Sequence, residues 1–422
     1  MSQQSRQGLR LGTRSLSFFF DGRKIDALEG DTVASALLAN GDRLFARSIK
    51  YHRPRGVLSA GPEEPNALVT VGEKPFNVPN LPATTLAVRQ DMKVFSQNRW
   101  PSLQRDLGAI LGLGGGLFSA GFYYKTFMWP GWRTYEGLIR RLAGLGPAPR
   151  ASRIEPPRVQ HLNCDVLVVG AGAAGISAAL AASRAGARTV VCERESGIGG
   201  ELEFEDANID GQSALDWIKG AETELTSNGV RILTETAVVG EAGRLVIAHR
   251  EPGGQATGAT AFHLHTESVV FATGATEQPI VFANNDRPGV MLLGAAERYL
   301  VRYGVKAAGT AVVFGNNNRI YSAARRLATA GVNIAAVVDT RTGVSSDEKS
   351  ALEERGVACL EGHAVAEALG SPYVAGAKIV PVSGAGERRE IPCDAVLVSG
   401  GWRLNAHANS TGSCHRYPAG SS

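Results

Sequence analysis

Short apolar runs separated by turn residues characterise the start of the chain. Residues 16–28 form two such runs on either side of the pair Asp21–Gly22, which predicts a β-hairpin. Thr32 then precedes an apolar stretch over residues 33–39, a pattern typical of a short capped helix. We therefore expect a first structural unit over residues 15–90.

The pattern then loses its regularity, and residues 91–160 are expected to form an irregular connecting segment. Within this segment, residues 107–124 carry no charge. The length of this uncharged stretch, 18 residues, is close to the lower limit for a membrane span. Six glycines in the same stretch lower its hydrophobicity and its helix propensity. We expect a buried connection here and no contact with a membrane.

From Cys164 onward the pattern changes to strand–helix–strand, and it repeats. Val166–Gly170 recurs as Ala311–Gly315 about 145 residues later, and the helix ends and second strands recur at nearly the same spacing. Two βαβ units predict two Rossmann-type domains. We assign residues 161–285 to the first domain and residues 286–392 to the second. Residues 393–422 are expected to be an incomplete return to the first domain and a polar tail.

Composition agrees with a soluble globular protein of about two to three domains. The chain has 422 residues, of which 44% are hydrophobic and 20% are charged. Its 44 basic and 40 acidic residues are too evenly balanced to predict a nucleic-acid partner. One local run, residues 43–55, is basic and contains no acidic residue, and we interpret it as a solvated or subunit-facing edge.

The cysteines and histidines give little sign of a metal site. The five cysteines are scattered and none forms a C-x-x-C pair, which argues against a zinc ribbon or a redox dithiol. His263 and His265 would share one face of a strand, but no third ligand is apparent, so we predict no metal. Single thiols and the absence of an apolar signal-peptide core near Met1 favour a cytoplasmic location.

The first repeat carries a full G-x-G-x-x-G fingerprint at Gly170, Gly172 and Gly175, between an apolar strand and an alanine-rich helix. The first glycine allows the tight turn, the second lets backbone approach a pyrophosphate, and the third lets helix and strand pack closely. The helix N-terminus attracts phosphate. Glu193, at the end of the next strand, can accept hydrogen bonds from ribose hydroxyls. This pattern predicts an adenine-dinucleotide site.

The choice between FAD and NAD stays open, because both present the same adenosine diphosphate half. An acidic residue at the ribose disfavours NADP, although the adjacent Arg194 weakens that inference. A strand over residues 269–271 ends in Ala-Thr-Gly, so Thr273 and Gly274 are expected at the crossing from the first domain to the second.

The second repeat is degraded. Gly315, Asn317 and Ile320 stand where a full fingerprint needs three glycines. Asn317 places a side chain where backbone should approach phosphate, and Ile320 crowds the helix–strand contact. Asp339 still occupies the position of a ribose-binding acid. We expect a retained fold without a tightly bound nucleotide.

Together these residues resemble the alpha subunit of heterotetrameric sarcosine oxidase over residues of about 15 to 402. The most specific stretch is Asn285–Met291, and the degraded second turn and the closing residues 398–402 also look like that family. Related amine, opine and hydrogen-cyanide-forming dehydrogenase subunits are similar but less close.

The resemblance implies oxidative demethylation of sarcosine to glycine, with hydrogen peroxide and formaldehyde or its folate adduct as further products. It implies FAD in the beta subunit, FMN near the alpha–beta interface, and NAD in the first Rossmann site of the alpha subunit. Beta, gamma and delta subunits are the implied partners. By carry-over, the NAD site would be lined by Ala173, Glu193, Arg194, Glu201 and Val238.

The first unit resembles a ferredoxin-like β-grasp domain of the two-iron, two-sulfur type. In cluster-binding relatives, cysteines fall at the positions of Ser59, Glu64 and Ala67. Thiolates hold such clusters, so we expect a structural module with no iron–sulfur cluster. The expected fold class is therefore α/β, with this module followed by two Rossmann-type FAD/NAD(P)-binding domains.

Beyond Trp402 the sequence departs from the family, and we interpret the chain as truncated before the folate-binding aminomethyltransferase domain. No residue is a convincing general acid, base or nucleophile, so we name no catalytic residue and expect the chain alone to be inactive. Two alternatives remain open. One is a stand-alone flavin reductase of the pyridine-nucleotide-disulfide type, and the other is a non-catalytic scaffold fragment.

Overall fold

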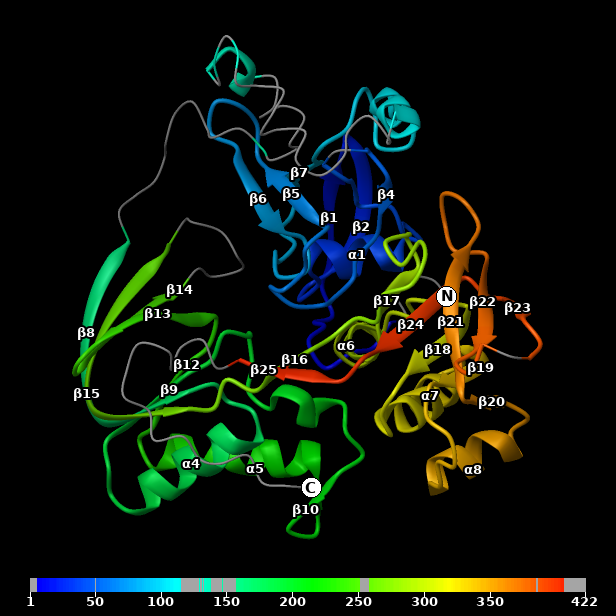
Figure 1. Cartoon of the computed structure of the whole chain (residues 1–422). Coiled ribbons are helices and arrows are strands. Elements are labelled where there is room, and N and C mark those ends of the chain that lie inside the picture. Colours follow the sequence, from blue (N-terminus) through cyan, green and yellow to red (C-terminus); the bar gives the residue numbers. More distant parts are fainter. Residues whose placement is uncertain are drawn as a thin grey trace. The chain divides into compact units, whose positions relative to one another are not determined.

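The computed structural model divides the chain into two compact units (Figure 1). Unit one comprises Met1–Arg153 and Glu277–Gly401, and unit two comprises Ile154–Thr276 and Trp402–Ser422. The structure describes the following residues: 6–49, 51–114, 129, 131, 133–137, 146, 157–250, 258–384 and 386–405. Each unit is described by itself.

Unit one begins with a five-stranded sheet in the order β2-β1-β7-β5-β6. Its elements are β1 (Ser15–Phe20), β2 (Arg23–Leu28), α1 (Val33–Ala39), β5 (Leu68–Val71), β6 (Val78–Pro82) and β7 (Lys93–Ser96), with a small pair β3 (Ala46–Arg47) and β4 (Pro54–Arg55) beside it. The predicted hairpin and helix are confirmed. Thr32 caps α1 in a capping box with Ser35.

One strand of this sheet lies in the segment expected to be irregular. β7 occupies the central position, parallel to β1 and antiparallel to β5. Val94 at its middle is fully buried. Sequence reasoning missed this strand because only four residues alternate, and such a short run is ambiguous without its neighbours.

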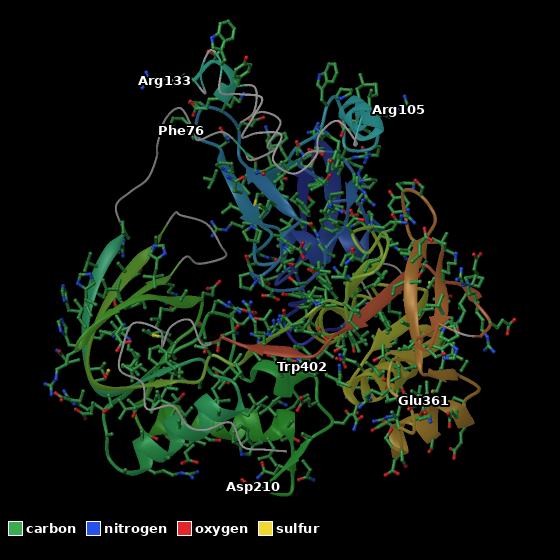
Figure 2. The ribbon with its side chains drawn as sticks, in the orientation of Figure 1. Phe76, Arg105, Arg133, Asp210, Glu361 and Trp402 are labelled. Carbon is green, nitrogen blue, oxygen red and sulfur yellow. The ribbon has the colours of Figure 1, made fainter. Side chains whose placement is uncertain are left out.

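The rest of unit one is a parallel five-stranded sheet in the order β17-β24-β18-β19-β20. Its strands and helices are β17 (Val290–Leu292), α6 (Leu293–Tyr303), β18 (Thr310–Gly315), α7 (Arg319–Thr329), β19 (Asn333–Asp339), α8 (Asp347–Glu354), β20 (Ala358–Glu361) and β24 (Ala395–Ser399). A three-stranded antiparallel sheet of β21 (His363–Leu369), β22 (Gly376–Pro381) and β23 (Arg389–Pro392) interrupts it in sequence. Glu361 lies at the end of β20 (Figure 2). It forms an ion pair with Lys349 of α8.

These two parts of unit one share one hydrophobic core. Buried side chains of the first part, including Phe18 of β1 and Phe45 just before β3, belong to the same cluster as Tyr299 and Tyr321. The fully buried Tyr299 donates its hydroxyl hydrogen to the carbonyl of Ser59 at 3.0 Å. Since such a core removes apolar surface of both parts from water, each part stabilises the other.

The basic run over residues 43–55 contributes to the same junction. Arg43 pairs with Asp394 at 3.0 Å, and Arg53 and Arg55 both pair with Asp286. The structure thus differs from the sequence interpretation of a solvated or subunit-facing edge. The acidic partners lie more than two hundred residues away in the sequence, so a local charge count could not find them.

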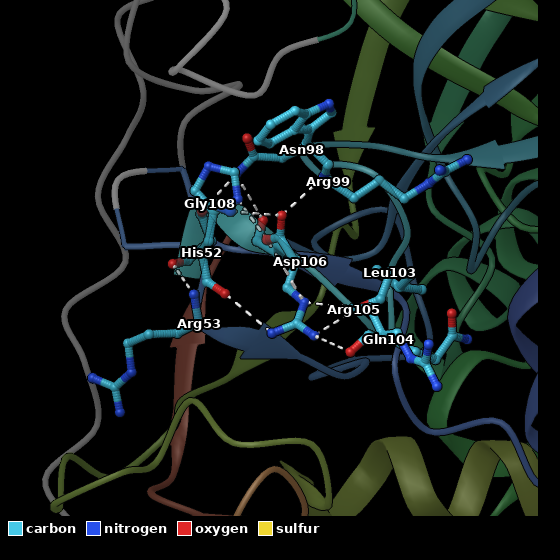
Figure 3. Close-up of polar contacts among 12 residues, drawn as sticks. His52, Arg53, Asn98, Arg99, Leu103, Gln104, Arg105, Asp106 and Gly108 are labelled. Atoms are coloured by element: carbon cyan, nitrogen blue, oxygen red, sulfur yellow. Dashed lines mark hydrogen bonds and ion pairs between the residues drawn. The ribbon is translucent and has the colours of Figure 1, made fainter. Parts of the chain in front are cut away.

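A buried polar network holds the chain beyond β7 (Figure 3). The Asp106 carboxylate lies 2.6 Å from Nδ1 of His52, and its other oxygen accepts the backbone N–H groups of Trp100 and Gly108 at 2.8 and 3.2 Å. Arg47 lies 4.0 Å from the same carboxylate. Because the Asp106 side chain is fully buried, these contacts replace its hydration.

The described part of the uncharged stretch is a 3-10 helix, η2 (Leu107–Gly114), and the remainder lies outside the described residues. Among the helices that the structure describes, none has the length and apolar character to cross a membrane. Residues 406–422, which include most of the expected polar tail, also lie outside the described residues.

Unit two is built on a six-stranded sheet in the order β12-β9-β8-β15-β14-β13. The elements are β8 (Arg158–Val169), α4 (Ala173–Arg184), β9 (Thr189–Cys192), η3 (Gly200–Glu203), β10 (Asn208–Ile209), β11 (Gln212–Ser213), α5 (Ala214–Ser227), β12 (Arg231–Leu233), β13 (Thr236–Ala242), β14 (Leu245–Arg250) and β15 (Thr260–Phe271). A short pair, β16 (Ala275–Glu277) and β25 (Trp402–Leu404), follows. The first Rossmann repeat is thereby confirmed.

Candidate nucleotide-binding site

The carboxyl end of β8 turns into α4 through a backbone that only glycine fits. Gly170 has φ +98°, and a Cβ placed there would lie 2.3 Å from the carbonyl oxygen of Ala272. A Cβ at Gly175 would lie 1.8 Å from the carbonyl oxygen of Gly170. Both glycines are thus required by close packing of strand, turn and helix.

Gly172 has a different role, because space is open around it. It is the N-cap of α4, with φ −76°, and a Cβ placed there would meet no atom within 4 Å. No side chain caps the helix at this position. The N–H groups of the first helical turn, from Ala173 onward, have no partner within the helix, and the dipole adds partial positive charge at this end.

A second glycine pair lies against this turn. The Gly199 N–H donates to the carbonyl of Ala171 at 2.8 Å, and a Cβ at Gly200 would lie 3.2 Å from the Cα of Gly172. Both residues have positive φ, +119° and +57°. Sequence reasoning missed this pair, although its Gly-Gly signal is visible. The turn therefore faces further backbone and carries no side chain at Gly172 itself.

Glu193 follows β9 and anchors the same turn. One carboxylate oxygen accepts the Ala171 N–H at 2.6 Å, and the other accepts the Glu195 N–H at 2.8 Å. Burial raises the pKa of Glu193 above the ordinary glutamate value of 4.5, against a smaller lowering by these backbone hydrogen bonds. Each carboxylate oxygen has a second lone pair. Glu193 can therefore hold the turn and also accept a hydroxyl hydrogen.

The other residues predicted for the site lie on several different segments of unit two. Ala173 and Arg194 are exposed, Glu201 lies in η3 directly after Gly200, and Val238 lies half-buried on β13. β13 begins beside Glu193, since the Thr236 N–H donates to the Glu193 carbonyl at 2.8 Å. The structure thus brings Glu193 directly to the turn. Val238 packs against the hydrophobic cluster that contains Val169 and Cys192.

A clamp made by Asn405 holds the Ala-Thr-Gly segment. The Thr273 hydroxyl donates to the Asn405 carbonyl at 2.8 Å, and the Asn405 amide donates back to the Thr273 carbonyl at 3.0 Å. The Asn405 N–H donates to the Gly274 carbonyl, and the Thr276 hydroxyl donates to the Asn405 side-chain oxygen. The described chain therefore does return to unit two. Sequence reasoning missed Asn405 because its partners lie 129 to 132 residues away.

The second repeat has the same strand–turn–helix order, but side chains occupy the space at its turn. The Asn317 amide donates to the backbone carbonyl of Ser399 at 3.1 Å, and Ile320 is fully buried. Asp339 is also fully buried, and it accepts hydrogen bonds from the Tyr321 hydroxyl and the Arg341 guanidinium at 3.0 and 2.8 Å. The side chains of this repeat thus bind one another.

The loop before β5 is organised by one buried carboxylate. Glu64 accepts the backbone N–H groups of Leu58, Ser59, Asn66 and Ala67 at distances of 2.7 to 3.2 Å. Burial raises the pKa of Glu64, and the four hydrogen bonds lower it by less.

Two family models match separate parts of the chain. Residues 165–273 match the family model described as "FAD dependent oxidoreductase", and residues 13–99 match the "2Fe-2S iron-sulfur cluster binding domain". Over almost its whole length the fold resembles L-proline dehydrogenase from P. horikoshii, at TM-score 0.62 and 19% identity, covering 96% of this chain and 63% of that chain. The expected α/β fold class is thus confirmed.

The chain is homologous to sarcosine oxidase alpha subunits. It is 42% identical over 415 residues to sarcosine oxidase subunit alpha of Rhizobium meliloti (strain 1021), covering 95% of this chain and 41% of that protein. It is 35% identical to the same subunit of Corynebacterium sp. (strain U-96), covering 94% of this chain and 38% of that protein. The resemblance seen in the sequence is confirmed, and the chain spans about two fifths of the length of these relatives.

The match over residues 13–99 contradicts the expectation of no iron–sulfur cluster, and that expectation is wrong: the module belongs by its sequence to the cluster-binding class. The expectation relied on three ligand positions, whereas the whole β-grasp pattern defines the class. All five cysteines lie outside residues 13–99, so this module does not itself supply the thiolates that hold a cluster.

Proposed function

We propose that the chain is the alpha-type subunit of a sarcosine-oxidising enzyme and that its first Rossmann turn binds NAD. The observation that carries the proposal is the open turn at Gly172, which lies at the N-terminus of α4 beside the buried carboxylate of Glu193. The pyrophosphate would meet the free N–H groups of the helix, and Glu193 would accept ribose hydroxyl hydrogens. Ala173, Arg194, Glu201, Val238, Thr273 and Gly274 are proposed to line the rest of the site.

The proposal of NAD at this site rests on the family resemblance, while the matched family model favours FAD. Both cofactors contain the adenosine diphosphate half that the turn and Glu193 suit. FAD would favour the alternative of a self-sufficient reductase. Against a disulfide reductase stand the described thiols: burial raises the pKa of Cys192 to about 12 and those of Cys359 and Cys393 to about 11. A thiol is a poor nucleophile in that state.

In the complete enzyme, we propose that other subunits carry the amine chemistry. The relatives are named as alpha subunits, which implies partner chains. Beta, gamma and delta subunits would assemble with this chain, and a flavin outside it would oxidise the amine while this chain binds nucleotide and supports the assembly. Sarcosine is the proposed substrate, and the chain alone is expected to form no peroxide from it.

The first experiment identifies the nucleotide. The purified chain is denatured, the released compound is separated by chromatography, and its absorbance is recorded. Release of NAD supports the proposal, and release of FAD overturns the choice of nucleotide in favour of the reductase. If nothing is released, the chain is titrated with NAD and with FAD by calorimetry, and failure of both to bind contradicts a nucleotide site.

A matched pair of glycine variants locates the site. Gly172 and Gly220 both have open space around a new Cβ, and both can become alanine without a backbone clash. Gly172→Ala places a methyl group where the phosphate would approach, so we expect at least about tenfold weaker binding. Gly220→Ala lies in the exposed middle of α5 and should leave the affinity unchanged. Equal affinity of the two variants would remove the turn from the site.

A further inference from the structure

Three histidines gather on one face of the long-stranded sheet of unit two. β8 and β15 run parallel, and their register places His161 directly opposite His263. His265 follows His263 by two residues, so it projects from the same face of β15. The pair His263 and His265 had no apparent third ligand in the sequence, and the strand register supplies one.

The imidazole rings are already close together. The centroid of the His161 ring lies 4.8 Å from that of His263, in an edge-to-face arrangement, and 6.1 Å from that of His265, nearly parallel. His161 therefore contacts both other rings. The side chains of His161 and His265 are exposed and that of His263 is half-buried. An ion from solution can reach all three.

We propose that His161, His263 and His265 bind a divalent transition-metal ion of the zinc, nickel or copper type. Neutral imidazole nitrogens are preferred ligands of these ions, and three histidines with one open position form a known zinc coordination set. Two histidines at i and i+2 on one strand, with a third on the neighbouring strand, approach one point above the sheet.

Ion binding requires the rings to turn. In the rotamers of the structure, no group of three or more His, Cys, Asp or Glu side chains among the described residues is arranged to hold a metal ion. Instead, the His161 ring meets His263 edge-to-face and stacks on His265. Because two of them are exposed, rotation about their side-chain bonds meets solvent and not the packed core. The ion would then join β8 to β15 by a bridge between the two strands.

Calorimetric titration of the full-length, untagged chain with Ni²⁺ and with Zn²⁺ tests the proposal. We expect saturation at one ion per chain. His161→Ala and His265→Ala should each weaken binding by at least about tenfold, since removal of even an outer-shell partner commonly has that effect. His363→Ala is the matched control, because it removes one imidazole from β21 of unit one. That control should bind the ion as the unchanged chain does.

A second readout separates ligation from misfolding. An ion that binds only the folded state raises the melting temperature by mass action. Ni²⁺ should therefore raise the melting temperature of the unchanged chain and of His363→Ala, but not that of His265→Ala, whose melting temperature without ion should be close to that of the unchanged chain. Absence of binding, or equal binding by His265→Ala and His363→Ala, overturns the proposal.

Discussion

The two strand–turn–helix repeats share a backbone plan and differ in what fills the turn. In the first repeat, Gly172 leaves open space at the start of α4, and Glu193 is held by two backbone N–H groups. In the second repeat, the corresponding Asn317 bonds to the carbonyl of Ser399, and Asp339 is bound by Arg341. The acidic residue at the end of the second strand therefore has a different partner in each repeat. Backbone N–H groups bind Glu193, and the Arg341 side chain binds Asp339.

This difference shows that the same fold can be kept with or without an open nucleotide turn. Ile320 stands at the position of the third glycine and is part of the core of unit one. The free N–H groups of a helix are useful to a ligand only where a glycine leaves them accessible. The second repeat keeps its structural role through packing with the first sheet.

The largest expected effect comes from filling the third glycine position of the first repeat. Gly175→Ala would place Cβ 1.8 Å from the carbonyl oxygen of Gly170 and 3.3 Å from the Cβ of Ala272. Because backbone must move, we expect unit two to lose about 3 kcal/mol or more of unfolding free energy. Urea unfolding followed by circular dichroism measures the loss. Gly220→Ala is the control, and equal stability of the two variants would contradict the close approach of helix and strand.

Neutralising the two corresponding acids should separate stability from binding. Asp339→Asn breaks an ion pair whose acidic side chain is buried and whose Arg341 partner is partly exposed. We expect a loss of about 2 kcal/mol in the stability of unit one, less than for a fully buried pair, with unchanged nucleotide affinity.

Glu193→Gln should lower nucleotide affinity, in contrast to Asp339→Asn. The amide keeps the size of the side chain, but its nitrogen cannot accept a ribose hydroxyl hydrogen or the N–H group of Ala171 or Glu195. We therefore expect about tenfold weaker nucleotide binding, or about 1.4 kcal/mol, together with a loss of stability in unit two. Thermal melts and calorimetric titration of both variants provide the measurements. A nucleotide affinity that falls equally in Asp339→Asn would contradict the comparison.

A smaller effect is expected from the clamp at Asn405. Asn405→Ala removes the two side-chain hydrogen bonds to Thr273 and Thr276 but keeps the backbone contact with Gly274. We expect a loss of about 1 to 2 kcal/mol in unit two. Hydrogen exchange of amides near the Ala-Thr-Gly segment should increase in this variant. Unchanged exchange there, with faster exchange elsewhere, would contradict the clamp.

The smallest effect concerns pH. Burial raises the pKa of Glu193, so its carboxyl group binds a proton more readily in the folded state than in the unfolded state. Its contribution to stability is fully present below the ordinary value of 4.5 and is lost as the pH rises through the raised folded value. The stability of the nucleotide-free chain minus that of Glu193→Gln should therefore decrease between pH 4 and pH 7. Urea midpoints across this range measure the difference, and an increase would show that the pKa is lowered.

Sequence reasoning predicted the elements that depend on local pattern. The Asp21–Gly22 hairpin, the Thr32 cap and the turn at Gly170 each have a signal within a few residues, and all are found in the structure. It missed β7, the Asn405 clamp and the ion pairs of Arg43 and Arg55. Each of these depends on a partner distant in the chain, and no local periodicity encodes such a partner.

The nucleotide stoichiometry tests the central claim most directly, namely that the first turn binds a dinucleotide and the second does not. Calorimetric titration of the full chain with NAD should give one site, which Gly172→Ala weakens and Asn317→Ala leaves unchanged. Two sites per chain, or loss of binding in Asn317→Ala with retention in Gly172→Ala, would contradict the account.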